Sequence, residues 1–212
     1  MSSTDRTRHP VLNVVLGALL GTSSGLAASA PPVADPAAGG ANVPVISVAP
    51  NGVPVVNIAA PSAAGLSHNR YQSFNVDASG LVFNNSTTVA QSQLGGAMLA
   101  NPQLGGRAAS VILNEVTQAN RSALNGFQEI HGAPAEYVLA NPYGITCNGC
   151  GFINTPRATL TTGEPDVGGG VLRGFRVRQG DIAVEGAGLD ATRQQTFDLL
   201  ARNVTVAAQI NA

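Results

Sequence analysis

Short apolar runs separated by tight corners most strongly limit what this chain can fold into. From Asn42 onward the β-branched segments are about four to eight residues long and are bounded by Gly, Asn or Pro. No helix-period tract lies between them, which argues against a doubly wound α/β fold. Charged residues make up only 11% of the chain, whereas a soluble helical protein fills its exposed faces with Glu and Lys. The pattern predicts an all-β protein.

Two all-β architectures fit this spacing, a β-sandwich and a parallel β-helix that stacks short strands into coils. Asparagines recur beside the runs, and Asn at a stacked corner can bond to backbone groups and tolerates left-handed conformations. These residues are Asn57, Asn75, Asn84, Asn101, Asn114, Asn141, Asn154 and Asn203. Their placement favours the β-helix, although no constant repeat length is visible.

The clearest hairpin signal lies early in the chain. Residues 43–48 (VPVISV) and 53–58 (VPVVNI) are β-branched runs joined by a linker that contains Asn51-Gly52. Pro44 and Pro54 near the run starts indicate edge or first-residue positions, because proline donates no hydrogen bond to a sheet.

The C-terminal third gives mixed local signals. Residues 164–170 (EPDVGGG) read as a flexible loop, and strict alternation over 174–186 predicts a hairpin or a turn between successive strands. Residues 190–202 carry a cap and an apolar face typical of a helix. Residues 204–210 (VTVAAQI) predict a last strand.

The first 30 residues have the three parts of a secretory signal peptide. Arg6 and Arg8 precede an apolar run over 11–20, and small residues then allow cleavage near Ala27–Ala30, with Ala27 favoured because Pro31 follows Ala30. A retained anchor or a buried helix is the alternative. Residues 31–41, rich in Pro, Ala and Gly, predict a flexible spacer.

Cys147 and Cys150 form a CxxC pair that could suit a redox or a zinc site. No βαβ pattern surrounds the pair, and no second cysteine pair completes a zinc site. In an exported chain a small structural disulfide, or apolar stacking of the two side chains, is the better interpretation.

Other chemistry-bearing patterns are missing from the sequence. Lys+Arg 11 against Asp+Glu 12 gives no basic excess for nucleic acid, and no dinucleotide or P-loop motif occurs. His68 and His131 stand beside turn residues, so we expect them to be solvent-exposed or satisfied within those turns. Arg70, Arg107 and Arg121 are expected to be lone, solvated charges. No cofactor, metal ion or catalytic residue is predicted.

Several segments, taken in order, resemble a known family. They are 53–86, 94–104 (LGGAMLANPQL), 109–116 (ASVILNEV) and 140–163 (ANPYGITCNGCGFINTPRATLTTG). The chain resembles the N-terminal secretion domain of two-partner secretion exoproteins, which include the filamentous haemagglutinin, haemolysin and contact-dependent growth inhibition proteins of Gram-negative bacteria.

The family has two Asn-Pro signatures, and both have counterparts here. Asn-Pro-Asn-Leu corresponds to Asn101, Pro102, Gln103 and Leu104, and Asn-Pro-Asn-Gly-Ile to Asn141, Pro142, Tyr143, Gly144 and Ile145. Gln103 and Tyr143 depart from the usual Asn. Each departure keeps the Asn-Pro turn, so the backbone shape is expected to persist while details of recognition are open.

The resemblance implies a right-handed parallel β-helix with extra-helical β-hairpins, one of which would fit 174–186. It places 190–202 in the β-solenoid, against the local helix signal. It also implies a role in which the POTRA domains of an outer-membrane TpsB-type β-barrel transporter recognise residues 42–212 in the periplasm and start secretion or surface display. Family members are usually far longer, so the chain is expected to be truncated at its C-terminal end.

Two other functions stay open from the residues. One is a surface adhesin fragment that binds host or neighbouring-cell glycans directly. The other is a polysaccharide-active β-helix enzyme, for which the charged residues are too few to give an obvious catalytic cluster.

Overall fold

Short strands of successive coils lie side by side and form the three sheets of a solenoid. The computed structural model describes residues 30–212, so the predicted signal peptide over 1–30 lies almost wholly outside the described residues. Sheet A carries, in spatial order, β1 (Val33–Ala34), β4 (Leu66–Ser73), β8 (Val111–Val116), β11 (Glu136–Ala140), β14 (Arg157–Thr161) and β19 (Thr196–Leu200). All its pairs except β1 with β4 are parallel.

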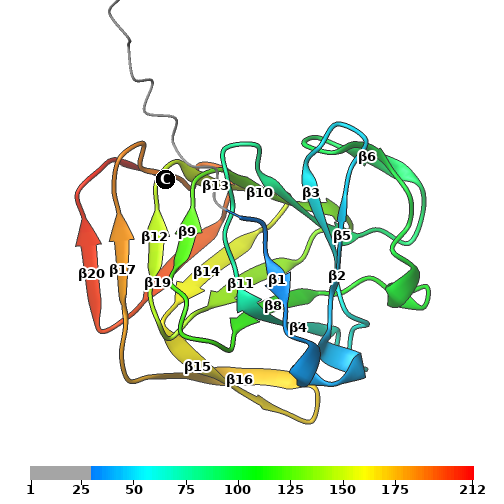
Figure 1. Cartoon of the computed structure of the whole chain (residues 1–212), viewed down its shortest axis with the longest axis horizontal. Coiled ribbons are helices and arrows are strands. Elements are labelled where there is room, and N and C mark those ends of the chain that lie inside the picture. The colour runs from blue at the N-terminus through cyan, green and yellow to red at the C-terminus, as the bar shows by residue number, and fades with distance from the viewer. Residues whose placement is uncertain (1–29) are drawn as a thin grey trace, which may run out of the picture.

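The other two sheets complete each coil. Sheet B carries β2 (Val45–Val48), β3 (Pro54–Asn57), β5 (Leu81–Asn85), β10 (Phe127–Gly132), β13 (Cys150–Ile153), β18 (Leu189–Asp190) and β21 (Ile210–Asn211). Sheet C carries β20 (Asn203–Val206), β17 (Asp181–Val184), β12 (Ile145–Cys147) and β9 (Ser122–Leu124). The chain visits sheets A, C and B in turn, as in β8, β9 and β10, and the next coil lies beside the last in parallel register (Figure 1).

This topology is a parallel β-helix, as predicted. Two antiparallel hairpins leave the coils, and they explain why no constant repeat length is visible in the sequence. We call β6 (Ala90–Ser92) with β7 (Gly96–Met98) the flap, and β15 (Gly163–Gly168) with β16 (Val171–Val177) the side hairpin. The side hairpin runs along the lower edge of Figure 1, and the flap lies at the upper right.

The interior between the sheets is apolar and carries a file of aromatic rings. Neighbouring ring centroids along this file are 5.0 to 6.2 Å apart, close enough for edge-to-face or offset packing. The file consists of Tyr71, Phe74, Phe83, Tyr137, Phe152 and Phe197. The rings come from β4 and the segment after it and from β5, β11, β13 and β19, so they join distant coils into one core.

Each hairpin covers an apolar patch on an outer face of the solenoid. Met98 of the flap packs on Val55 and Val82 of sheet B. Phe175 and Leu172 of the side hairpin pack on an apolar cluster of sheet A that includes Leu113. The hairpins thus bury outward-facing side chains that the coils alone would leave in water.

For 174–186 the predicted hairpin is wrong, whereas the alternative, a turn between successive strands, is confirmed by the link between β16 and β17 (Asp181–Val184). The predicted loop over 164–170 is also wrong. Residues 163–168 form β15, which pairs with β16 across Gly169 and Gly170, whose φ angles of 63° and 73° suit a two-residue hairpin turn. Ile182 and Val184 do alternate, but their partners are Ile145 and Cys147 of the preceding coil. The alternation therefore reports one sheet face, not a local hairpin.

The segment expected to be a flexible spacer, 31–41, is instead partly structured. Val33 and Ala34 pair with β4, and the buried Asp35 side chain accepts hydrogen bonds from Ala37 N at 3.0 Å and Thr117 Oγ1 at 2.7 Å. Short 3₁₀ turns follow at Pro36–Ala38 and Gly40–Asn42. The segment lies along the free edge of the first coil, where β4 has no strand from an earlier coil to pair with.

Several local predictions are confirmed. Strands β2 and β3 form an antiparallel hairpin, and Pro54 is the first residue of β3. For residues 190–202 the local helix signal is wrong, and the placement in the β-solenoid implied by the resemblance is confirmed, since they supply β19 to sheet A. The single last strand predicted over 204–210 is wrong, because β20 ends at Val206 in sheet C and β21 begins at Ile210 in sheet B.

Candidate functional site

The first Asn-Pro corner links the flap to β8 and begins a 3₁₀ turn, Pro102–Leu104. Asn101 is buried, and its Oδ1 accepts a hydrogen bond from Gln103 N at 2.9 Å. Its Nδ2 donates to the carbonyl oxygens of Ile58 and Asn84, both at 2.9 Å. One side chain therefore shapes its own turn and ties it to the ends of two strands of sheet B.

The rest of this corner divides into a buried and an exposed part. Leu104 enters the main core, while Pro102 is exposed. Gln103, which replaces the family's usual Asn, donates from Nε2 to the Asn57 carbonyl oxygen at 2.7 Å. The longer amide side chain thus adds a further contact with β3.

The second Asn-Pro corner lies between β11 and β12 and repeats this arrangement. Asn141 is fully buried, and its Oδ1 accepts from Tyr143 N at 2.9 Å. Its Nδ2 donates to Asn120 O and to Ser122 Oγ, both at 2.9 Å, on the preceding coil. Ile145 is buried, whereas Tyr143 exposes 39% of its surface.

Arg121 clamps the second corner, which the sequence alone did not reveal. Its guanidinium donates to Ile145 O at 3.0 Å and pairs with Asp181 at 2.8 Å, so it joins three successive coils. The hydrogen bond from Arg121 lowers the pKa of Asp181 and, in return, raises the pKa of Arg121. Gly144 has a φ of 108°, and a Cβ there would collide with the Arg121 guanidinium.

The expectation of lone, solvated arginines is therefore wrong for the three residues it named. Arg70 pairs with Glu115 at 3.1 Å, and Arg107 donates to backbone carbonyls, including Ser62 O at 2.6 Å. The sequence could not place these partners, because each lies on another coil or loop dozens of residues away.

The structure joins Cys147 and Cys150 in a disulfide, with Cα atoms 5.3 Å apart. Both side chains are buried in the core, and the corner between them is held by hydrogen bonds to Leu124 O and Gly188 O of the adjacent coils. The pair follows the second Asn-Pro corner directly, so both belong to one coil.

The two Asn-Pro corners do not form one site. Asn101 lies where the chain passes from sheet B to sheet A, just before β8. Asn141 lies where it passes from sheet A to sheet C, just after β11, which is the next strand of sheet A. Both Asn side chains are buried, and the exposed members of the motifs are Pro102 and Tyr143. In the folded coils, a partner could touch only these exposed residues and their neighbours.

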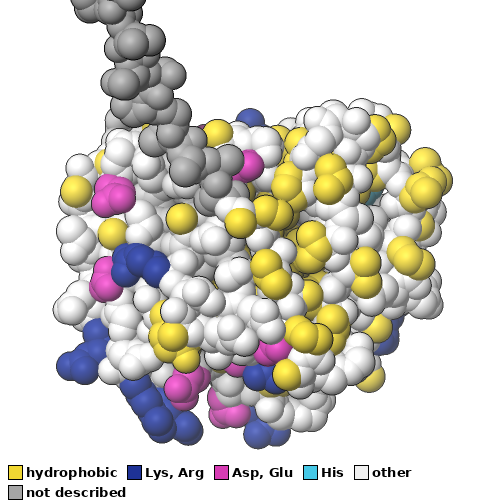
Figure 2. Space-filling model, viewed as in Figure 1, with side chains coloured by type: hydrophobic (Ala, Val, Ile, Leu, Met, Phe, Trp, Pro, Cys, Tyr) yellow, Lys and Arg dark blue, Asp and Glu magenta, His cyan; other side chains and the backbone are white. Residues whose placement is uncertain are grey.

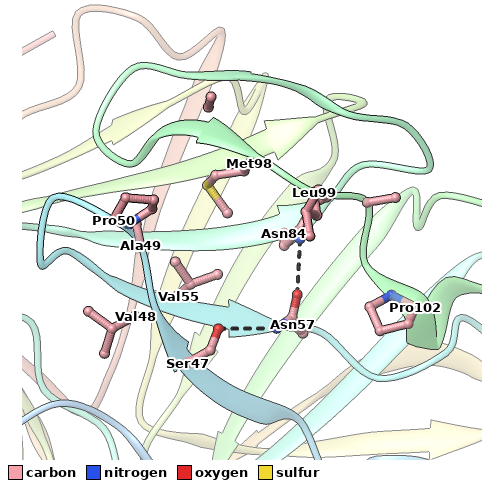
Figure 3. A pocket seen from close by; sticks show the side chains of 12 residues that line it. Ser47, Val48, Ala49, Pro50, Val55, Asn57, Asn84, Met98, Leu99 and Pro102 are labelled. Atoms are coloured by element: carbon pink, nitrogen blue, oxygen red, sulfur yellow. Dashed lines mark hydrogen bonds between the residues drawn. The ribbon is translucent and has the colours of Figure 1, made fainter.

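A groove of about 330 Å³ opens beside the first corner. Its lining is apolar or uncharged, and Figure 3 shows Pro102 at one end and Val48 and Pro50 at the other, with hydrogen-bonded Asn57 and Asn84 in its floor. Val48 and Leu99 expose 66% and 75% of their surface. In Figure 2 the part of the surface over β2, β3 and the flap is rich in hydrophobic side chains, whereas charged side chains gather toward the C-terminal coils and the side hairpin.

The described residues hold no group of three or more His, Cys, Asp or Glu side chains placed to bind a metal ion. Within 30–212 no helix is long and apolar enough to cross a membrane.

Comparison with known proteins relates the chain to much longer proteins. A "tRNA nuclease CdiA" of Yersinia mollaretii is 52% identical over 164 residues, which are 76% of this chain and 6% of that protein. A "Hemolysin" of Serratia marcescens is 58% identical over 139 residues, 66% of this chain and 9% of that protein. The chain therefore spans only a small part of the length of these relatives. The nuclease and hemolysin names describe those longer proteins.

Solved structures and family models agree with this relationship. The crystal structure of a filamentous hemagglutinin secretion domain superposes with a TM-score of 0.75 at 43% identity, covering 82% of this chain and 56% of that one. The sequence model of the TPS secretion domain matches residues 31–212. The buried Asn-Pro corners, the β-helix and these matches lead to one conclusion: the chain belongs to the TPS secretion domain family.

Proposed function

We propose that this chain is the secretion domain of a larger exported protein, and that the POTRA domains of an outer-membrane β-barrel transporter recognise it in the periplasm. Its family membership supports the general role, because TPS exoproteins are secreted or displayed on the surface of Gram-negative bacteria. Recognition by the transporter then starts passage of the exoprotein to the cell surface.

The observation that carries the proposal is that each Asn-Pro corner combines a buried Asn with an exposed residue. Asn101 and Asn141 are buried and hold neighbouring coils together, so a transporter can read their side chains only before those coils close. Strand edges that are unpaired at that stage can add to a partner's sheet by β-augmentation. A solenoid suits this order of events, because its contacts are mostly between neighbouring coils and can form one after another.

Pro102 and Tyr143 stay exposed after folding and give the partner a second means of contact. Beside Pro102 lies the uncharged groove of Figure 3, and an apolar surface of this kind can pack against another protein. The proposal therefore has two separable parts, recognition of an open chain through Asn and recognition of exposed corners through Pro102 and Tyr143.

A binding assay with the immobilised POTRA region of the cognate transporter tests the proposal. The chain is added either folded or freshly diluted from denaturant, as wild type, as Asn101→Ala with Asn141→Ala, and as Tyr143→Ala. We expect tighter binding of the freshly diluted chain and a loss of about tenfold or more in affinity for the double variant. Asn203→Ala, at an exposed position of β20, is the matched control. Equal binding of the double variant and the wild type would refute the proposed recognition.

A further inference from the structure

A second, polar cavity lies on the other side of the flap from the groove of Figure 3. It has a volume of about 360 Å³ and is bounded by the flap, by β10 and by the end of β13. Its lining residues are Ala90, Gln91, Gln93, Glu129, Ile130, His131, Gly132, Ile153, Asn154 and Arg193. None of the Asn-Pro residues lines this cavity, so it is separate from the corners discussed above.

Glu129 and His131 are its buried polar residues. The Glu129 carboxylate accepts hydrogen bonds from Ser92 Oγ at 2.7 Å, Gln93 N at 2.8 Å and Leu94 N at 2.7 Å, which hold the flap against β10. His131 is 2% exposed, and its Nε2 has no hydrogen-bond partner within the described chain. A buried polar atom without a partner is uncommon in native proteins and calls for an explanation such as a bound molecule.

The charge state of His131 follows from its surroundings. Burial lowers the pKa of the imidazole, and the nearby Glu129 carboxylate opposes this only in part. At neutral pH the ring is therefore uncharged and offers one donor and one acceptor.

Exposed polar side chains form the rim. Gln91 and Gln93 come from the flap, and Arg193 follows β18. Asn154 is held in place because its Nδ2 donates to Ile130 O at 2.7 Å and Gly132 O at 3.0 Å. Arg193 makes no ion pair with the described residues, and its guanidinium carbon lies 6.0 Å from the centre of the Phe127 ring.

The chemistry of this lining selects a class of ligand. One carboxylate and one guanidinium give no net charge. The amides of Gln91 and Gln93 and the imidazole both donate and accept hydrogen bonds, and Asn154 offers its Oδ1 as an acceptor. A phosphate or sulfate is negatively charged and would approach the Glu129 carboxylate, whereas sugar hydroxyl groups are neutral and both donate and accept hydrogen bonds. The volume falls within the range of small-molecule sites, at its lower end.

We propose that this cavity binds a single unit of a neutral saccharide. The hydroxyl groups of the sugar bond to the amides of Gln91, Gln93 and Asn154 and to Arg193 at the rim, and to the unpartnered edge of His131 at the base. This inference goes beyond the secretion role and does not depend on it.

Ligand-observed NMR with the full chain tests the inference. The probes are glucose, galactose and N-acetylglucosamine as neutral sugars, glucuronate as an acidic sugar, and inorganic phosphate. We expect saturable binding of at least one neutral sugar with a dissociation constant on the order of 1 mM, and a shifted His131 ring signal in a separate protein-observed NMR spectrum. The proposal would be overturned if none of the neutral sugars bound saturably. It would also be overturned if only glucuronate and phosphate bound, because Arg193 would then be a simple anion contact.

Variants at the exposed rim locate the binding without disturbing the buried base. Gln91→Ala and Arg193→Ala should each weaken sugar binding about tenfold, while Gln179→Ala and Arg173→Ala, exposed near or on the side hairpin, should leave it unchanged. Sugar binding that survives both rim substitutions would place the ligand elsewhere. Because the same four variants keep both Asn-Pro corners, their binding to the POTRA region is expected to match the wild type, so the two proposals can fail independently.

Discussion

At the scale of single residues, two buried asparagines make the same pattern of hydrogen bonds at different corners. Asn101 and Asn141 each accept a hydrogen bond from the backbone N–H two residues later and donate two hydrogen bonds to other parts of the chain. The Pro that follows fixes φ in the turn and lacks an N–H that would need a partner. The Asn-Pro motif therefore stabilises the fold, independently of any contact that it makes with a partner.

We expect Asn141→Ala to lower the free energy of unfolding by about 3 kcal/mol, because it removes three hydrogen bonds and leaves buried groups unpaired. Tyr143→Ala should change it by less than about 1 kcal/mol, since the ring is partly exposed. Urea denaturation followed by circular dichroism measures both, with exposed Asn203→Ala as control. Similar losses for Asn141→Ala and Tyr143→Ala would mean that the exposed ring also supports the fold.

His131 makes stability depend on pH in a defined direction. Its pKa is lowered in the folded chain, mainly by burial, so the unfolded chain binds this proton at a higher pH. Stability therefore rises with pH across the interval below the ordinary His value of about 6.5, and falls on acidification. We expect denaturation curves at pH 7 to 5 to show this fall, with a slope no steeper than about 1.4 kcal/mol per pH unit for one proton.

The matching variant is His131→Gln, which cannot titrate in this range. Its unfolding free energy should vary less between pH 7 and pH 5 than that of the wild type. An unchanged pH dependence in the variant would assign the effect to another group.

At the scale of elements, the two hairpins are attached to the coils by different means. The side hairpin relies on apolar packing through Phe175, Leu172 and Val167. The flap has Met98 in a small apolar cluster, but its turn is held by the Glu129 carboxylate. The flap also separates the apolar groove from the polar cavity, so its position controls the shape of both.

We expect Glu129→Gln to loosen the flap while the coils stay folded. The amide has one acceptor oxygen in place of two and brings an NH₂ group against backbone donors, which should cost about 2 kcal/mol. Hydrogen exchange should rise in residues 90–98 and stay low in β10 and β13. Glu136→Gln, at an exposed site in β11, is the control, and equal exchange in the two variants would refute the role of Glu129.

At the scale of the whole molecule, burial is uneven along the solenoid. The middle coils contribute fully buried rings such as Tyr137 and Phe152, whereas Phe197 in β19 is only partly buried. Leu200, Val204, Val206 and Ile210 of the last coil expose 37% to 52% of their surface. In this structure the last coil is thus the least covered part of the core.

This gradient predicts how stability is distributed. Phe152→Ala should lower the free energy of unfolding by about 4 kcal/mol, and Phe197→Ala by about half as much, because less of its ring is removed from water. Native-state hydrogen exchange should report opening of β19, β20 and β21 before β11 and β13. Equal losses for the two variants, or exchange that begins in the middle coils, would contradict a stepwise solenoid.

The sequence by itself determined the local features, namely short strands, Asn-Pro and Asn-Gly corners, the β2–β3 hairpin and the family resemblance. These depend on residues next to one another, whose φ preferences and turn chemistry act over a few positions. The recurring asparagines favoured a β-helix, and the stacked coils show why, since the side chains of Asn101 and Asn141 donate hydrogen bonds to other segments of the chain.

Only the tertiary structure decided which strands pair. The pattern over 174–186 predicted a hairpin. Instead β16 pairs antiparallel with β15, which precedes it in the chain, and β17 pairs parallel with β12 of the preceding coil. Likewise Arg121, Glu129 and His131 gained their surroundings from coils that are remote in sequence. The reason is physical: alternation reveals that a strand has two faces, but its partner is chosen by burial and register against a whole coil, which no local pattern contains.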